Sequence, residues 1–147
     1  MLEHDPDPVE FYAAALACLA PGGRLILGVP SSDGYLARLV DFVLNAPPHH
    51  VTWWSDRALQ TLVRRFRGEV LELRHAPVEP WERRLRSYAA LSPKSMRRFR
   101  GGKALHVRCA LAWLASPIAM RLRPPAATDR GATTVIVVRH GSGKRRP

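Results

Sequence analysis

The strongest hydrophobic run of the chain is Arg-Leu-Ile-Leu-Gly-Val-Pro at residues 24–30. A nearly continuous apolar run of this length favours a parallel strand covered on both faces over a half-exposed antiparallel strand. Residues 21–23, Pro-Gly-Gly, predict the end of a helix and a tight turn with positive φ before the strand. Residues 30–34 predict a loop at its carboxyl end, where open α/β sheets bind ligands.

A helix is predicted before this strand, and a shorter one after it. Asp7 is a good N-cap for the first helix, whose apolar stripe Val9, Tyr12, Leu16 and Leu19 has helical spacing. The apolar positions within residues 35–44 also fit a helix. The order helix, strand, loop is that of an αβ unit in a layered α/β fold.

A second helix and strand follow the loop. Ser55 or Asp56 is expected to cap a helix over residues 57–67, and Gly68 to close it. Residues 69–75 alternate between apolar and polar side chains, which predicts a strand with one wetter face.

Residues 81–130 break this pattern and predict a helical insertion. A first helix is expected around residues 81–91, followed by a basic stretch at 94–103. An apolar helix is then expected from Ala104 to about Arg121, and Pro117 should kink or end it.

The last β-branched run, residues 133–139, predicts the final strand. The chain is therefore expected to be an α/β protein with a core formed by residues 1–80 and 131–140. The insertion at 81–130 interrupts this core, and residues 141–147 form a basic tail.

The composition fits one globular domain of 147 residues. Two cysteines, Cys18 and Cys109, stand far apart in apolar contexts and are expected to be buried reduced thiols. The amino-terminal residues lack a signal-peptide pattern, and the longest apolar segment, at 109–120, is too short for a membrane span. A cytoplasmic protein is expected.

The positive charge lies in the second half of the chain. Residues 1–80 carry 7 arginines and 10 acids, net −3, whereas residues 81–147 carry 16 basic residues and 2 acids, net +14, which together give the +11 of the whole chain. The basic stretch at 83–103 allows three interpretations: a solvated helix face, contact with nucleic acid or an anionic membrane surface, or binding of an acidic acceptor.

An ordered set of motifs carries a family resemblance. These motifs are Glu3-His4, Asp7-Pro8, Leu19-Ala20-Pro21-Gly22-Gly23-Arg24-Leu25 and Val29-Pro30. Together they resemble class I S-adenosylmethionine-dependent methyltransferases of the small-molecule type, and the loop at residues 45–55 is similar to one subgroup. The resemblance covers residues 1–75 and 131–140. It implies a partial Rossmann-like methyltransferase sheet, the carboxyl-terminal half of the domain, with residues 24–29 as its fifth strand.

The resemblance begins in the middle of the family's domain. The first four strands, the glycine-rich loop that approaches the methyl donor and the acidic residue that holds its ribose are not matched by these residues. Asp5 also departs from the apolar residue that the family usually has. A late reading-frame start, a truncated remnant, or a partner chain that completes the sheet would each account for this. The chain alone is expected to be inactive or weakly active.

The resemblance places Glu3 and His4 beside the donor S-adenosylmethionine, where His4 would act as a base or a donor contact. A solvent-facing turn that caps a helix is the alternative. His49 and His50, on a proline-rich loop, are candidate catalytic and acceptor-binding residues, and the alternative is a buried loop whose imidazoles bond backbone carbonyls.

Four further residues are candidates for acceptor binding. Trp53 and Trp54 would form an aromatic wall beside the histidines, and Asp33 and Tyr35 would edge the site. No metal site is expected, because no third ligand of fitting type lies near the two histidines in the sequence.

The function expected from the resemblance is methyl transfer from S-adenosylmethionine to a small-molecule or lipid-linked acceptor. The alternative is a non-enzymatic binding module that uses its basic half on nucleic acid, a membrane or another chain.

Overall fold

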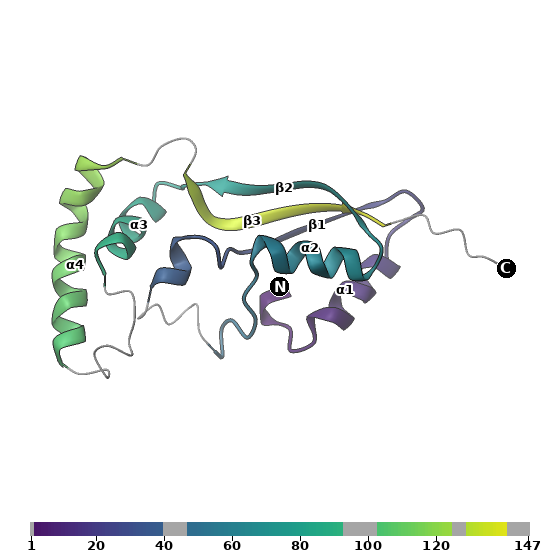
Figure 1. Ribbon diagram of the computed structural model, residues 1–147, viewed down its shortest axis with the longest axis horizontal. Helices are drawn as coiled ribbons and strands as arrows, with labels where there is room; N and C mark the ends of the chain where they lie inside the picture. Colours follow the sequence, from purple (N-terminus) through teal and green to yellow (C-terminus); the bar gives the residue numbers. More distant parts are fainter. Residues whose placement is uncertain (1, 40–46, 93–102, 125–128, 141–147) are drawn as a thin grey trace.

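The computed structural model describes residues 2–39, 47–92, 103–124 and 129–140. These residues form three strands, four α-helices and two short 3-10 helices, η1 (Leu2–His4) and η2 (Tyr35–Arg38). Figure 1 shows a long sheet with α1 and α2 against it, and with α3 and α4 at the opposite end of the molecule. The chain has the mixed α/β fold that its sequence predicts.

The last strand lies in the middle of the sheet, whose order is β1-β3-β2. β1 (Arg24–Pro30) and β2 (Glu69–Pro77) each pair antiparallel with β3 (Arg130–Arg139). Ile136 of β3 stands opposite Leu27 of β1 and also opposite Leu73 of β2. The two outer strands therefore run parallel to one another, although neither is paired with a parallel strand in the described residues.

Within the described residues, β1 is not the parallel strand covered on both faces that its apolar run favours. Its strand partner is antiparallel, and its burial alternates along the strand. Leu27 and Val29 are buried, whereas Ile26 is 66% exposed. Only one face of β1 packs in the core of the described residues, so the other apolar positions meet solvent.

The helices α1 (Pro8–Ala17) and α2 (Asp56–Arg65) build the main core on the covered face. The buried side chains of this core come from both helices, the sheet, η1 and the loop before α2: Leu2, Tyr12, Leu16, Leu27, Val29, Trp54, Leu59, Leu62, Val63, Ile136 and Val138. Cys18, expected to be buried, is exposed because it follows the last turn of α1.

The sequence signals for the helix starts and the turn are confirmed. The Asp7 carboxylate accepts a hydrogen bond from the Val9 N–H at 3.1 Å, and the Ser55 hydroxyl accepts one from the Ala58 N–H at 3.1 Å. Each cap satisfies a backbone donor that the first helical turn leaves without a partner. Gly22 has a φ of 75°, as the turn before β1 requires.

Gly68 closes α2 by its size and not by a left-handed conformation. The residue with positive φ is Arg67, at 53°. A Cβ atom on Gly68 would lie 2.9 Å from Val63 and 3.1 Å from Val138, while the Gly68 N–H donates to the Val63 carbonyl at 3.0 Å. Glycine therefore allows α2 to pack closely on β3.

The helices α3 (Glu82–Leu91) and α4 (Lys103–Leu122) lie between β2 and β3 in the chain, where the helical insertion is predicted. With η2 they enclose a second, smaller core. The Trp113 ring meets the Tyr88 ring edge-on at 5.5 Å, and the Arg84 guanidinium lies 3.9 Å from the centre of the Trp113 ring. Aromatic and cation–π contacts thus join α3 to α4.

Pro117 is expected to kink or end α4, and the helix does not end there, because it continues to Leu122. Proline has no N–H, so the carbonyl of Trp113 loses its usual helical donor. The Ser116 hydroxyl donates to that carbonyl at 2.7 Å, and Ser116 is fully buried against Arg84. Neither α4 nor any other described helix is both long and apolar enough to cross a membrane.

Some predicted features lie outside the described residues. These are the second part of the helix expected at residues 35–44, whose first part is η2, the basic residues Lys94, Arg97, Arg98 and Arg100, and the tail at 141–147.

Glu82 ties η2, the start of β3 and the residues before α3 together through its buried carboxylate. One oxygen accepts from the Ala132 N–H at 2.9 Å and the Tyr35 hydroxyl at 3.3 Å, and the other from the Glu79 N–H at 2.8 Å. In Glu82→Gln the amide NH₂ has to face one of these donors. We expect urea denaturation to give a free energy of unfolding about 2 kcal/mol lower.

The matched control is Glu72→Gln. The Glu72 side chain is half exposed and lies 3.5 Å from Arg74, so its loss should change the unfolding free energy by less than about 0.5 kcal/mol. Equal effects of the two substitutions would contradict the role given to Glu82.

Candidate functional site

Segments distant in the sequence meet near the carboxyl end of β1. The Glu3 carbonyl in η1 accepts hydrogen bonds from the Val51 and Thr52 N–H groups at 2.9 and 3.2 Å. The Ser32 N–H donates to the Trp54 carbonyl at 2.9 Å. These backbone bonds hold the loop after residue 47 against η1 and the end of β1, which is the end expected to carry the chemistry.

The four residues expected to contact donor or acceptor at this end are brought together. His4 Nδ1 donates to the His49 carbonyl, and His4 Nε2 lies 3.5 Å from a carboxylate oxygen of Glu3. The rings of His4 and His50 meet edge-on with 5.1 Å between their centres. This group, Glu3, His4, His49 and His50, is called the histidine cluster below.

The hydrogen bond to the His49 carbonyl orients His4. A carbonyl oxygen only accepts, so Nδ1 of His4 carries the hydrogen in that bond. In the neutral ring the lone pair is then on Nε2, the nitrogen that faces Glu3. Nε2 is therefore the atom of His4 available as a base or a ligand.

Glu3 and His50 differ in charge state within the cluster. Burial alone would raise the pKa of Glu3. In the 147-residue chain, hydrogen bonds to the carboxylate, first of all from the terminal amino group, and the positive charges of that group and of His4 outweigh burial and hold the pKa below its usual value. Burial lowers the pKa of His50, and the Glu3 carboxylate opposes this shift only in part. At neutral pH the cluster thus presents an ionised carboxylate beside a neutral His50 imidazole.

The cluster also brings together three groups of metal-ligating type. Ligand atoms of Glu3, His4 and His50 lie within 4.8 Å of one another. The expectation that no third ligand lies near the histidines is therefore wrong, because folding places η1 beside the loop. Two imidazoles and one carboxylate form a donor set suited to a divalent transition metal, and the carbonyl bond to His4 is the kind of outer contact that orients such ligands.

The two tryptophans of the loop lie in different environments. Trp54 is in the main core, and its indole N–H donates to the Thr52 hydroxyl at 3.0 Å. Trp53 is 52% exposed. Trp54 thus anchors the loop. Of the two indoles, Trp53 is the one that a ligand could contact.

Asp33 and Tyr35, expected at the edge of the acceptor site, line a separate cavity of about 670 Å³. The cavity lies among η2, α3, α4 and the start of β3, and its lining includes no member of the histidine cluster. The Tyr35 hydroxyl donates to Glu82, and burial followed by the charge of Glu82 raises the pKa of Tyr35 well above its usual value. Tyr35 therefore remains a neutral donor.

Four arginines line this cavity, and the sequence alone does not identify them as a group. Arg86 pairs with Asp129 at 2.7 Å, and Arg130 lies 3.6 Å from Asp56. The other two, Arg38 and Arg123, form no ion pair within the described part of the chain. They come from segments far apart in the sequence, so no spacing could reveal their convergence. A cavity of this volume with unpaired guanidinium groups suits an organic anion.

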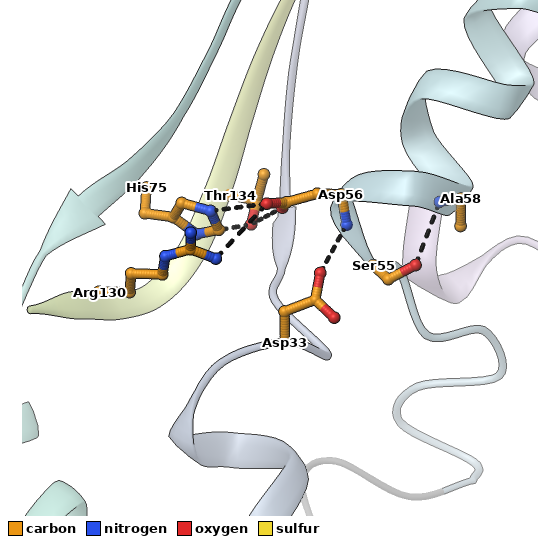
Figure 2. A network of polar contacts seen from close by, with 7 residues as sticks. All are labelled: Asp33, Ser55, Asp56, Ala58, His75, Arg130 and Thr134. Carbon is orange, nitrogen blue, oxygen red and sulfur yellow. Dashed lines mark hydrogen bonds and ion pairs between the residues drawn. The ribbon is translucent and has the colours of Figure 1, made fainter.

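A second polar network lies between α2 and the sheet. Figure 2 shows Asp56, His75, Thr134 and Arg130 turned toward one another. His75 bonds Asp56 at 3.0 Å and Thr134 at 3.1 Å, and the Asp56 N–H donates to Asp33 at 2.8 Å. The order carboxylate, imidazole, hydroxyl resembles a catalytic triad, but Thr134 is fully buried and no substrate reaches its hydroxyl. The network joins α2 to β2 and β3.

No protein-family model, curated protein sequence or solved structure matches the chain.

The lowered pKa of His50 can be measured by NMR. In the folded protein we expect the His50 ring protons to titrate with a midpoint below 6.5. Glu3→Gln should lower the midpoint further, because the carboxylate charge favours the imidazolium. The unfolded chain binds this proton more tightly, so the stability contributed by neutral His50 is complete above about pH 6.5 and is lost as the pH falls through the folded midpoint.

Glu72→Gln serves as the control for this titration, since Glu72 lies on β2 and pairs with Arg74. It should leave the His50 midpoint unchanged. A midpoint that rises in Glu3→Gln would contradict the contact between Glu3 and His50.

Proposed function

We propose that this chain forms the second half of a class I S-adenosylmethionine-dependent methyltransferase core and supplies the acceptor side of its site. The observation that carries the proposal is the strand order β1-β3-β2, with an antiparallel strand between two parallel ones. The family's sheet has the same arrangement at one edge, where the last strand lies antiparallel between the fifth and the sixth. β1, β2 and β3 correspond to the fifth, sixth and seventh strands.

The free side of β1 supports the same assignment. Among the described residues β1 has one strand neighbour, β3, and Ile26 on its uncovered face is exposed. In the family the fourth strand lies on the other side of the fifth. A strand with one empty hydrogen-bonding edge and an exposed apolar face is suited to further pairing.

The histidine cluster lies where the donor and acceptor would meet. Methyl transfer by SN2 needs the acceptor atom in line with the sulfonium methyl, and a base when the acceptor carries a proton. Glu3 and His4 correspond to the family's turn beside the donor. His4 and the neutral His50 are the candidate bases, while His49 orients His4 through its carbonyl.

The cavity is the proposed place of the acceptor body. Asp33 and Tyr35 lie in its wall, and Arg38 and Arg123 would bind an anionic group of the acceptor. Trp53 would contact the part of the acceptor nearest the histidines. The acceptor class is therefore a small organic molecule, free or lipid-linked, with an acidic group.

The donor requires a segment that the described residues do not contain, since no described strand is followed by a glycine-rich loop and a helix. We expect isothermal titration calorimetry to detect no S-adenosylmethionine binding in the millimolar range or tighter for the 147 residues alone. Extending the chain with upstream in-frame coding sequence that carries a strand, a Gly-x-Gly loop and a helix should give micromolar binding.

In the extended chain Glu3→Gln should weaken donor binding about tenfold, equivalent to about 1.4 kcal/mol, whereas Glu72→Gln should not. Tight donor binding by the 147 residues alone would contradict the half-site. An upstream frame without such a segment, or an extended chain that fails to bind the donor, would contradict the methyltransferase assignment.

A further inference from the structure

One face of α4 is apolar and exposed along the whole helix in the described part of the chain. Its members are Val107, Leu111, Leu114, Ile118 and Leu122, with exposed fractions of 56, 59, 70, 63 and 76%. Their spacing of three or four residues places them on one side of the helix. These five side chains are called the outer stripe.

The opposite side of α4 already has its packing partner. Leu105, Ala112 and Ser116 are buried, and Trp113 contacts both Tyr88 and Arg84 of α3. Figure 1 shows α4 at one end of the molecule with α3 on its inner side. The outer stripe is therefore a second apolar face that the packing of α3 and α4 does not use.

Basic side chains border the outer stripe. Lys103 precedes Val107 by one helical turn, and Arg121 follows Ile118 by three residues, so both lie along one edge of it. Arg108 lies toward the other edge. No acidic residue occurs between Glu82 and Asp129 in the sequence, so α4 itself carries basic side chains and no acidic ones.

We propose that the outer stripe of α4 binds the surface of an anionic lipid bilayer, with the helix axis in the membrane plane. The apolar side chains would enter the boundary between headgroups and acyl chains, while the long basic side chains reach the lipid phosphates. This binding goes beyond methyl transfer and does not depend on it.

The charge and the stripe together favour a bilayer over other partners. Nucleic acid would attract the basic side chains, but its phosphate backbone offers no apolar surface for five exposed hydrophobic side chains. Two copies of the chain would bring two positively charged helices together, and each chain carries a net charge of +11. An anionic bilayer satisfies both features of the surface.

The experiment is sedimentation of the full chain with vesicles made from equal parts of phosphatidylcholine and phosphatidylserine. We expect it to bind these vesicles, to bind pure phosphatidylcholine at least about tenfold more weakly, and to lose affinity as the salt concentration rises. Ile118→Gln combined with Leu114→Gln should lower the partition coefficient on anionic vesicles at least about tenfold.

The matched control is Ile26→Gln. Ile26 is 66% exposed on β1, close to the 63% of Ile118, but it lies outside α4. It should leave vesicle binding unchanged, and circular dichroism should show that every variant retains the wild-type helix content.

Three results would overturn the proposal. They are equal binding to neutral and anionic vesicles, unchanged binding when the outer stripe is made polar, and a self-association in sedimentation velocity that Ile118→Gln abolishes while vesicle binding persists. DNA binding in place of vesicle binding would assign the surface to nucleic acid and would also overturn it.

Discussion

The backbone ladder of β3 is the interaction on which the rest of the structure depends. β1 and β2 are separated by almost forty residues of sequence, and β3 joins them by pairing with both. Ile136 and Val138 of β3 are fully buried in the core that α1 and α2 cover. Without this central strand the two outer strands would have no described partner, and the end of β1 would not be held beside the loop that carries the histidines.

Two chemically different places lie beyond the carboxyl end of β1. At the end of β1, backbone bonds from the loop to Glu3 assemble the histidine cluster, where an ionised carboxylate, an oriented His4 and a neutral His50 lie together. Beside η2 and α4 lies an arginine-containing cavity. The first place suits proton transfer or cation binding, and the second suits recognition of an anion. This division is what an acceptor with a reactive end and an acidic group requires.

Local features of the fold could be predicted from the sequence, and features set by distant contacts could not. Asp7 and Ser55 were recognisable as caps because their bonds lie within three residues, and Gly22 because a tight turn needs positive φ. The direction of the partner of β1 depends on a strand more than a hundred residues later. The continuation of α4 through Pro117 depends on the Ser116 hydroxyl, and the meeting of Arg38 with Arg123 depends on the packing of α4. Glu3 and His50 were separately identifiable as candidates, but only folding places them within ligand distance.

The central position of β3 has a consequence for synthesis of the protein on the ribosome. Residues 130–139 are synthesised after both outer strands and after the helical insertion, yet each strand pair in the described sheet includes them. β1 and β2 therefore have no strand partner, and their apolar side chains stay exposed, while the whole helical insertion is translated. This takes several seconds at roughly 5–20 residues per second. The pairing of α3 with α4 is local and can form in that interval, so the insertion can fold before the sheet that it interrupts.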